Sequence, residues 1–285
     1  MRLTRTARLN VGSTAGANAL ASLVAATVVA TLSLSPADAK TLRVGNEGVY
    51  PPFSIIDSDG KPTGIEPDLA REVCKRMKVE CEIVAMDFKA LIPSILQGKF
   101  DFIATQYAPT PQRKAKLDFS IPVVLNPGTY VVPKDSNFTF TAEGMKGKGV
   151  KIGLQRGSAM VEPAKKAFGD SVEYVYYDNP DQMKLDLLAG RINMVFDSKI
   201  NWTTTLIEKP EGKDWKLDGG DFWVGDPNIP EAERGYSWVV RKGNTELLDK
   251  INAALKEIVA DCTYTQIRKK YLSVPSLPAE RHCVS

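Results

Sequence analysis

The chain has 285 residues, of which 43% are hydrophobic and 25% charged, and these shares are typical of a soluble globular protein. The composition excludes disorder, collagen and coiled coil, and the length allows one large domain or two of about 100–150 residues. A formal net charge of +3 is too small to favour nucleic acid or an acidic membrane as a partner. The only histidine, His282, lies near the C-terminus, which argues against a His-based metal site. No cofactor is expected.

Residues 1–39 have the pattern of an export signal. Three arginines among the first eight residues precede an apolar run from residue 19 to residue 34, and Ala37-Asp38-Ala39 has the small-x-small pattern of a cleavage site. A single transmembrane anchor is the alternative, but polar residues interrupt the run and Pro36 ends it. We therefore expect cleavage after Ala39 and an exported, soluble product.

Strand and helix patterns alternate along the rest of the chain. Strands are expected where short apolar or alternating runs occur, at residues 41–45, 82–85, 100–104, 150–154, 172–177 and 192–196. Helices are expected where apolar residues recur at helical spacing, from Pro67 onward, at 90–96, at 159–168, from Asn179-Pro180 onward and around 248–258. This alternation predicts the α/β fold class.

One eight-residue pattern occurs twice, 92 residues apart. Residues 96–103 (LQGKFDFI) and 188–195 (LAGRINMV) share Leu-x-Gly-basic-apolar-Asp/Asn-x-apolar. Chance or convergence is the alternative, because a helix that ends at glycine before a buried strand is common. The same order of elements around both copies favours two similarly folded lobes. Ligands bind beyond the carboxyl ends of such strands, which are expected at Thr105 and Asp197.

Four cysteines in an exported chain suggest two disulfides, for which three pairings are possible. Cys74 and Cys81 flank one expected helix-to-strand connection, and Cys262 and Cys283 both lie near the C-terminus. Proximity along the chain favours pairing within these two sets. A CxxC motif is absent, so catalytic thiol chemistry is not expected.

Sequence motifs of common enzyme classes are absent. The chain has no GxSxG, GxxxxGK[ST] or HExxH motif, and no GxGxxG after an expected strand. A single histidine close to the C-terminus also argues against a Ser-His-Asp triad. Carboxylate pairs are too common at this composition to single one out, so the motifs indicate no enzymatic reaction.

A set of segments, in this order, resembles a known family. The segments are residues 44–53 (VGNEGVYPPF), 64–70 (GIEPDLA), 90–96 (ALIPSIL), 110–113 (TPQR), 119–122 (FSIP), 260–264 (ADCTY) and 270–272 (KYL). Together they resemble the family 3 solute-binding proteins, which are the periplasmic amino-acid-binding proteins of ABC importers. Within that family the chain is most similar to lysine/arginine/ornithine-, histidine- and opine-binding members, some of which share the Cys-x6-Cys spacing.

The resemblance implies an α/β fold of the type II periplasmic binding protein class, with two lobes that close on a ligand like a hinge. We place the crossings between lobes near Leu125-Asn126 and near Glu233-Arg234. The expected organisation is a signal peptide at residues 1–39, a first lobe at 40–125 and 233–285, and a second lobe at 126–232.

The resemblance also assigns roles to individual residues. Arg113 matches the arginine that binds the ligand's α-carboxylate with two parallel hydrogen bonds. Tyr50 and Phe88 match positions whose rings sandwich the ligand's stem. Gly157 and Ser158 precede an expected helix, so their backbone N–H groups could receive a carboxylate oxygen, although Ser158 could also be a simple N-cap.

Two positions depart from the family pattern. Ala108 stands where the family usually has a serine or threonine hydroxyl for the carboxylate. The acid that meets the α-ammonium usually lies one residue after Asp197, where this chain has Ser198. We favour Asp197 for this role, because a buried ammonium needs a charged acceptor. Thr105 and Gln106, at the end of the strand before Arg113, complete the expected ligand site.

Glu47 lies in the loop where binders of basic amino acids and opines carry an acid. Its charge would suit a ligand with a distal ammonium or guanidinium, and the alternative is a solvent-facing loop residue. We therefore expect a monomeric periplasmic binder that delivers a polar or basic amino acid, or an opine-like derivative, to the permease subunits of an ABC importer. The main alternative is a periplasmic enzyme on the same scaffold, such as a cyclohexadienyl dehydratase, in which Glu47 or Asp197 would be a general acid. The sensor domain of a receptor is a third reading, which needs a downstream membrane helix.

Overall fold

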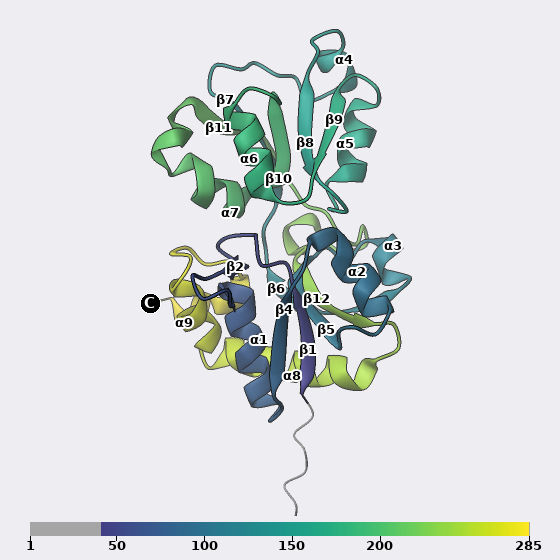
Figure 1. Ribbon diagram of the computed structural model, residues 1–285, viewed down its shortest axis with the longest axis vertical. Helices are drawn as coiled ribbons and strands as arrows, with labels where there is room; N and C mark the ends of the chain where they lie inside the picture. Colours follow the sequence, from purple (N-terminus) through teal and green to yellow (C-terminus); the bar gives the residue numbers. More distant parts are fainter. Residues whose placement is uncertain (1–40, 285) are drawn as a thin grey trace, which may run out of the picture. The chain divides into compact units, whose positions relative to one another are not determined.

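The structure is a computed structural model that describes residues 41–284, which belong to one compact unit (Figure 1). The predicted signal peptide at residues 1–39 lies outside the described residues. Two five-stranded sheets organise the chain, each with helices packed on it, and the predicted α/β class is confirmed. No helix among residues 41–284 has the length and apolar character needed to cross a membrane.

The first sheet has the strand order β4-β1-β5-β12-β6. Its strands are β4 (Cys81–Ala85), β1 (Leu42–Asn46), β5 (Phe102–Tyr107), β12 (Tyr236–Arg241) and β6 (Leu117–Val124). Its helices are α1 (Ile65–Arg76), α2 (Phe88–Leu96), α3 (Pro111–Lys114), α8 (Thr245–Ala260) and α9 (Thr263–Lys269). A short hairpin of β2 (Ile55–Ile56) and β3 (Pro62–Thr63) precedes α1. We refer to these elements as the first lobe.

The second sheet has the strand order β11-β7-β10-β8-β9. Its strands are β11 (Trp215–Phe222), β7 (Gly128–Pro133), β10 (Met194–Ser198), β8 (Lys151–Gln155) and β9 (Glu173–Tyr177). Its helices are α4 (Ala142–Met145), α5 (Val161–Phe168), α6 (Pro180–Leu188) and α7 (Lys199–Trp202). We refer to these elements as the second lobe.

The two lobes repeat one topology. In the first, β1 pairs in parallel with both β4 and β5, and in the second β8 pairs in parallel with both β9 and β10. In each sheet an antiparallel strand then pairs with the last strand of this parallel set. It is β12, which pairs with β5, in the first lobe and β7, which pairs with β10, in the second. The second copy of the sequence pattern therefore marks a second copy of the fold.

The repeated glycines explain where the two central strands begin. Gly98 and Gly190 have φ of +77° and +68° and follow the last turns of α2 and α6. Residues 99–101 and 191–193 then turn before the chain becomes extended, so β5 and β10 start two residues later than the sequence predicts. Phe100 and Ile192 are buried although neither lies in a strand, which is why their apolar character suggested an earlier start.

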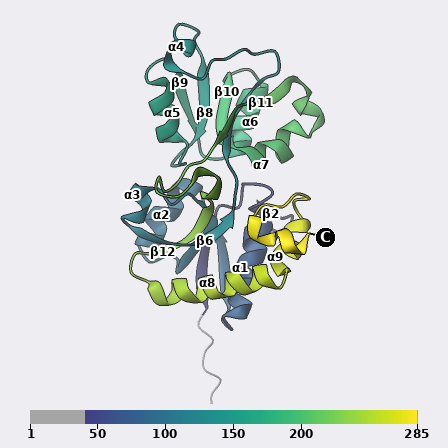
Figure 2. The same cartoon turned by 180° about the vertical axis from the view of Figure 1, so that it is seen from behind.

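Apolar side chains cover both faces of each sheet. On the first sheet, α1, α8 and α9 pack on one face, as seen from behind in Figure 2, and α2 packs on the other. On the second, α5 packs on one face and α6 on the other. The helix expected from Pro67 begins at Ile65, so the proline falls within the first turn, where its missing N–H costs nothing.

The chain passes between the sheets twice. Residues 125–127 connect β6 of the first sheet to β7 of the second, and residues 223–235 connect β11 back to β12. The lobe boundaries at 125/126 and 232/233 stay our proposal for where each lobe begins and ends.

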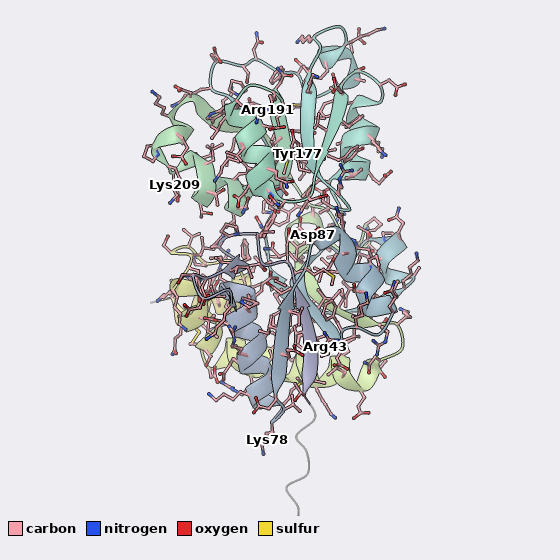
Figure 3. The ribbon with its side chains drawn as sticks, in the orientation of Figure 1. Arg43, Lys78, Asp87, Tyr177, Arg191 and Lys209 are labelled. Atoms are coloured by element: carbon pink, nitrogen blue, oxygen red, sulfur yellow. A yellow bond between two sulfur atoms is a disulfide. The ribbon has the colours of Figure 1, made fainter. Side chains whose placement is uncertain are left out.

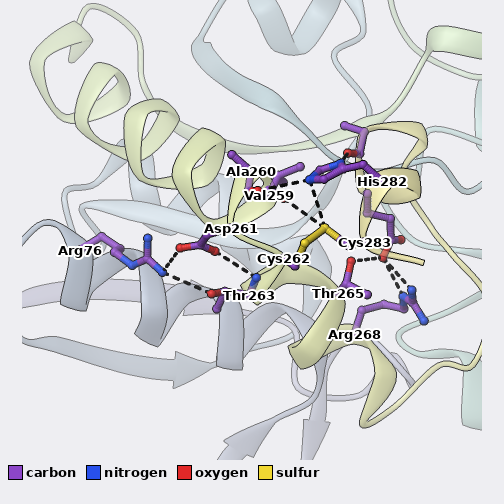
Figure 4. Close-up of a disulfide and its surroundings, with 12 residues drawn as sticks. Arg76, Val259, Ala260, Asp261, Cys262, Thr263, Thr265, Arg268, His282 and Cys283 are labelled. Carbon is purple, nitrogen blue, oxygen red and sulfur yellow. Dashed lines mark hydrogen bonds and ion pairs between the residues drawn. A yellow bond between two sulfur atoms is a disulfide. The ribbon is translucent and has the colours of Figure 1, made fainter. Parts of the chain in front are cut away.

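Both predicted disulfides are present. Cys74–Cys81 joins the last turn of α1 to the start of β4, and Cys262–Cys283 joins the α8–α9 junction to the C-terminal segment, with Cα–Cα distances of 6.1 Å and 5.5 Å. Figure 4 shows the second bridge beside His282. This cluster has metal-ligand residue types, but its two sulfurs are bonded to each other and offer no thiolate.

A fully buried ion pair holds the C-terminal segment on α9. The Glu280 carboxylate accepts hydrogen bonds from Arg268 at 2.7 Å and 3.1 Å and from the Thr265 hydroxyl at 2.9 Å. The backbone N–H groups of Ser276 and Leu277 donate to its other oxygen at 2.6 Å and 3.2 Å. Both charged side chains are completely excluded from solvent. The charge of Arg268 therefore depends on this one carboxylate for compensation.

We predict that Glu280→Ala lowers the free energy of unfolding by about 3–5 kcal/mol, because it leaves a buried guanidinium unpaired. Denaturant titration of the wild type and the variant measures this difference. Lys250→Ala removes an exposed ion pair and is the matched control, with an expected change below about 1 kcal/mol. A loss for Glu280→Ala as small as that of the control would contradict the prediction.

Candidate functional site

A small cavity lies where the carboxyl ends of the central strands meet. It leaves about 30 Å³ free, which is room for only one or two water molecules. Both lobes contribute, through Glu47, Tyr50, Phe88, Gln106, Arg113, Gln155, Ser158, Ala159, Met160, Asp197, Ser198 and Tyr236. An amino acid could enter only if these walls moved apart.

Glu47 is one of the residues that line the cavity. It follows β1 and is only 4% exposed, so it is no solvent-facing loop residue. The Gln155 side-chain amide, at the end of β8, donates a hydrogen bond to it across the two lobes. Burial raises the pKa of Glu47 well above its ordinary value, and the nearby Asp197 carboxyl raises it further, while the bond from Gln155 partly opposes this rise. A positive charge placed beside Glu47 would relieve this penalty.

Asp197 lies at the end of β10, where the strand-end rule predicts a ligand contact. Its Oδ1 accepts a 2.9 Å hydrogen bond from the Tyr50 hydroxyl of the first lobe, and its Oδ2 accepts a 3.0 Å bond from the Trp202 indole. Burial raises the pKa of Asp197, and these two bonds oppose the rise. Asp197 and its neighbour Ser198 both line the cavity.

Arg113, on the short helix α3, also lines the cavity. Its guanidinium donates to the Ala108 carbonyl at 3.1 Å and, across the lobes, to the Gly157 carbonyl at 2.9 Å. It lies over the Tyr107 ring, 4.8 Å from the ring centroid, and near the Phe88 ring at 5.9 Å. Burial lowers its pKa, and within residues 41–284 it has no carboxylate partner.

Most of the predicted site residues line this one cavity. Seven do so, namely Glu47, Tyr50, Phe88, Gln106, Arg113, Ser158 and Asp197. Thr105 and Gly157 do not. The Thr105 hydroxyl donates to the Glu66 carboxylate behind the cavity at 3.4 Å, and Gly157 meets Arg113 through its carbonyl rather than its N–H. Whether the nine residues bind a ligand stays a prediction.

Five lining residues were missing from the sequence prediction, and one of them carried a signal. Gln155 follows Gly153 in β8 by two residues, as Glu47 follows Gly45 in β1. A Cβ on Gly45 would come within 3.0 Å of Phe100, and a Cβ on Gly153 would come within 3.0 Å of Ile192. Phe100 and Ile192 hold the same place in the repeated pattern, so the two strands correspond. Tyr236 is the first residue of β12, directly after the second crossing, and no local pattern placed it near β5.

The charged groups in the cavity do not balance. Glu47 and Asp197 are two carboxyl groups, whereas Arg113 is the single cationic side chain in the lining. Glu47 and Asp197 are buried and Arg113 is partly buried, and the pKa shifts described above show that burial penalises each charge. The cavity therefore suits a molecule with one negative and two positive groups.

Comparisons with known proteins agree with this geometry. The family model of bacterial extracellular solute-binding proteins, family 3, matches residues 42–274. An L-arginine-binding protein of Pseudomonas aeruginosa is 32% identical over 256 residues, covering 88% of this chain and 95% of that protein. A lysine/arginine/ornithine-binding periplasmic protein of Escherichia coli is 33% identical over 237 residues, covering 81% and 87%.

A solved structure is similar over nearly its whole length. The structure of an ancestral arginine-binding protein bound to arginine has a TM-score of 0.71 and 34% identity, covering 81% of this chain and 97% of that chain. These relatives are binding proteins. With its two lobes and a match that spans nearly all described residues, the chain belongs to the family 3 bacterial extracellular solute-binding proteins.

Proposed function

We propose that this protein is the periplasmic solute-binding component of an ABC importer and that its ligand is a basic amino acid or an opine-like derivative of one. The observation that carries the proposal is the charge imbalance of the cavity, two buried carboxyl groups against one guanidinium. A basic amino acid has one carboxylate and two cationic groups, so each charge of the ligand meets an opposite charge.

The positions of the three charged side chains suggest how such a ligand binds. Its α-carboxylate would replace the Gly157 carbonyl as the partner of Arg113, whose planar guanidinium suits two parallel bonds. Its α-ammonium would bind Asp197, and its distal cation would bind Glu47. Tyr50 and Phe88, which both line the cavity, would flank the aliphatic stem.

The relatives support this ligand class and the transport role. Several are named for binding arginine, histidine or lysine/arginine/ornithine, and two are named as ABC transporter arginine-binding proteins. We extend to this chain their periplasmic location, which its N-terminal export pattern also favours, and their cooperation with a membrane permease. We propose that it acts as a monomer and binds rather than transforms its ligand.

We predict that Arg113→Ala weakens binding of arginine by at least about 2 kcal/mol while the fold stays intact, because the ligand carboxylate loses its buried partner. Isothermal titration calorimetry measures the affinity, and circular dichroism checks the fold. Arg191→Ala is the matched control, since Arg191 lies on the second lobe and does not line the cavity (Figure 3). Near-native affinity of folded Arg113→Ala would refute the assigned carboxylate contact.

We predict that Glu47→Gln weakens binding of arginine and lysine by about 1.5–3 kcal/mol, or roughly 10- to 150-fold, through loss of a charge-assisted contact. Glutamine is the neutral ligand for comparison, and its affinity should change little, because the substitution keeps the shape of the side chain. Calorimetric titration of arginine and of glutamine into the wild type and into Glu47→Gln measures the four affinities that test this prediction. Equal losses of affinity for both ligands would mean that Glu47 supports its loop and does not interact with the ligand's distal charge.

We predict that binding of arginine releases a proton at pH values between the pKa of Glu47 in the complex and its pKa in the empty cavity. In the empty cavity burial raises the pKa of Glu47 and favours the protonated form, whereas a bound cation favours the ionised form and lowers that pKa. The affinity for arginine should therefore fall as the pH drops through the raised pKa, by at most about tenfold per pH unit for one proton. Calorimetry in buffers of different ionisation enthalpy measures the release. The same release in Glu47→Gln would exclude Glu47 as its source.

A further inference from the structure

Glu66 is a buried acid that does not line the cavity. It is the second residue of α1 and is 2% exposed. Its Oε2 accepts hydrogen bonds from the Ser54 hydroxyl at 3.3 Å and the Thr105 hydroxyl at 3.4 Å. Its Oε1 makes no hydrogen bond of normal geometry among the described residues, but the Trp238 indole N–H, which is also unpaired, lies close enough to lower the pKa of Glu66. Burial raises the pKa of Glu66 to about 8, so at neutral pH it is mainly a neutral acid.

A chain of hydrogen bonds runs from Glu66 to the loop that holds Glu47. The Asn46 side-chain amide donates to the Ser54 hydroxyl at 2.9 Å, and that hydroxyl donates to Glu66. The Asn46 side-chain oxygen in turn accepts from the Gly48 backbone N–H at 3.0 Å. Asn46 and Gly48 are the two neighbours of Glu47. The backbone is therefore fixed on both sides of the residue that faces the cavity.

The same serine also fixes the turn that carries Tyr50. The Tyr50 N–H donates to the Ser54 carbonyl at 2.7 Å, and the Ser54 N–H donates to the Tyr50 carbonyl at 2.9 Å. The Glu66 N–H itself donates to the Phe53 carbonyl at 2.9 Å. The start of α1 and the loop after β1 thus form one hydrogen-bonded unit, with Glu66 and Ser54 at its centre.

The direction of the hydrogen bonds at Ser54 determines what kind of side chain can replace Glu66. Because the Ser54 hydroxyl accepts from Asn46, its own proton is free to point toward Glu66, which must then act as an acceptor. A neutral acid or an amide offers such an oxygen, whereas an apolar side chain of the same size does not. The charge state matters as well, because a negative Glu66 raises the pKa of Glu47. A neutral Glu66 supports the loop without hindering ionisation of Glu47.

We propose that Glu66 is a positioning residue for ligand selectivity, which it exerts through Ser54 and Asn46 by fixing the backbone on both sides of Glu47. This proposal rests on the proposed function, in which Glu47 binds the distal positive charge of the ligand. A role of Glu66 in core packing alone would affect all ligands equally. A positioning role affects the ligands that contact Glu47 with their charge.

The test compares affinities for arginine and for glutamine at pH 7 in five proteins. Besides the wild type, these are two variants of Glu66 and two serine variants. Glu66→Gln keeps an acceptor oxygen, and Glu66→Leu removes it. Ser54→Ala breaks the chain of hydrogen bonds, and Ser94→Ala leaves that chain intact. Ser94 is the matched control, since it is a buried serine of α2 whose hydroxyl bonds to Met86 outside this chain of bonds. Calorimetry gives the affinities, and thermal melts report the fold.

We expect Glu66→Leu and Ser54→Ala to reduce the ratio of arginine affinity to glutamine affinity about tenfold, the effect of losing roughly one buried hydrogen bond. Glu66→Gln and Ser94→Ala should keep the wild-type ratio within about twofold. If Glu66→Leu does not fold, Ser54→Ala with Glu66→Gln still gives the answer.

Three results would overturn the proposal. Equal losses for both ligands in Ser54→Ala and Glu66→Leu would reduce Glu66 to a packing residue, and so would a Glu66→Gln ratio as low as that of the other variants. A wild type that binds arginine and glutamine equally would refute the basic preference itself, and the role of Glu66 in it. The wild-type ratio therefore separates failure of the proposed function from failure of this inference.

Discussion

Burying an ion without a partner costs several kcal/mol, and this constraint governs the cavity between the lobes. Glu47 and Asp197 are buried there and Arg113 is partly buried, and when all three are ionised their charges do not sum to zero. The protein limits the cost with neutral donors and acceptors. Gln155, Tyr50 and Trp202 donate to the two acids, and the carbonyls of Ala108 and Gly157 accept from the arginine. A bound basic amino acid would replace these neutral hydrogen-bond partners with groups of opposite charge.

The repeated topology explains why these groups meet. In each lobe the parallel strands end at the same edge, and the residues that follow those strands face the other lobe. Glu47 follows β1 and Gln155 ends β8 at corresponding positions, and they bond to each other. Bonds that cross the lobes, such as Tyr50 to Asp197 and Arg113 to Gly157, would have to break for a ligand to enter. Binding would thus exchange contacts between lobes for contacts with the ligand.

Much of the fold and part of the site could be predicted from sequence, for identifiable reasons. Helix periodicity and the glycine-ended repeat are local signals, so they predicted where α2, β5, α6 and β10 begin to within two residues. Arg113 needed the family resemblance, because a single arginine between two polar residues looks exposed. Tyr236 could not be predicted, since a strand that returns after more than a hundred residues beside β5 leaves no local trace. The turn of Thr105 toward Glu66 depends on a side-chain direction that a strand pattern does not fix.

The most direct test of the account is a crystal structure of the protein with arginine in the cavity. The account predicts the α-carboxylate on the Arg113 guanidinium, the α-ammonium on Asp197 and the ligand guanidinium on Glu47, each within hydrogen-bond distance. A ligand whose carboxylate lies away from Arg113, or whose guanidinium points away from Glu47, would contradict it.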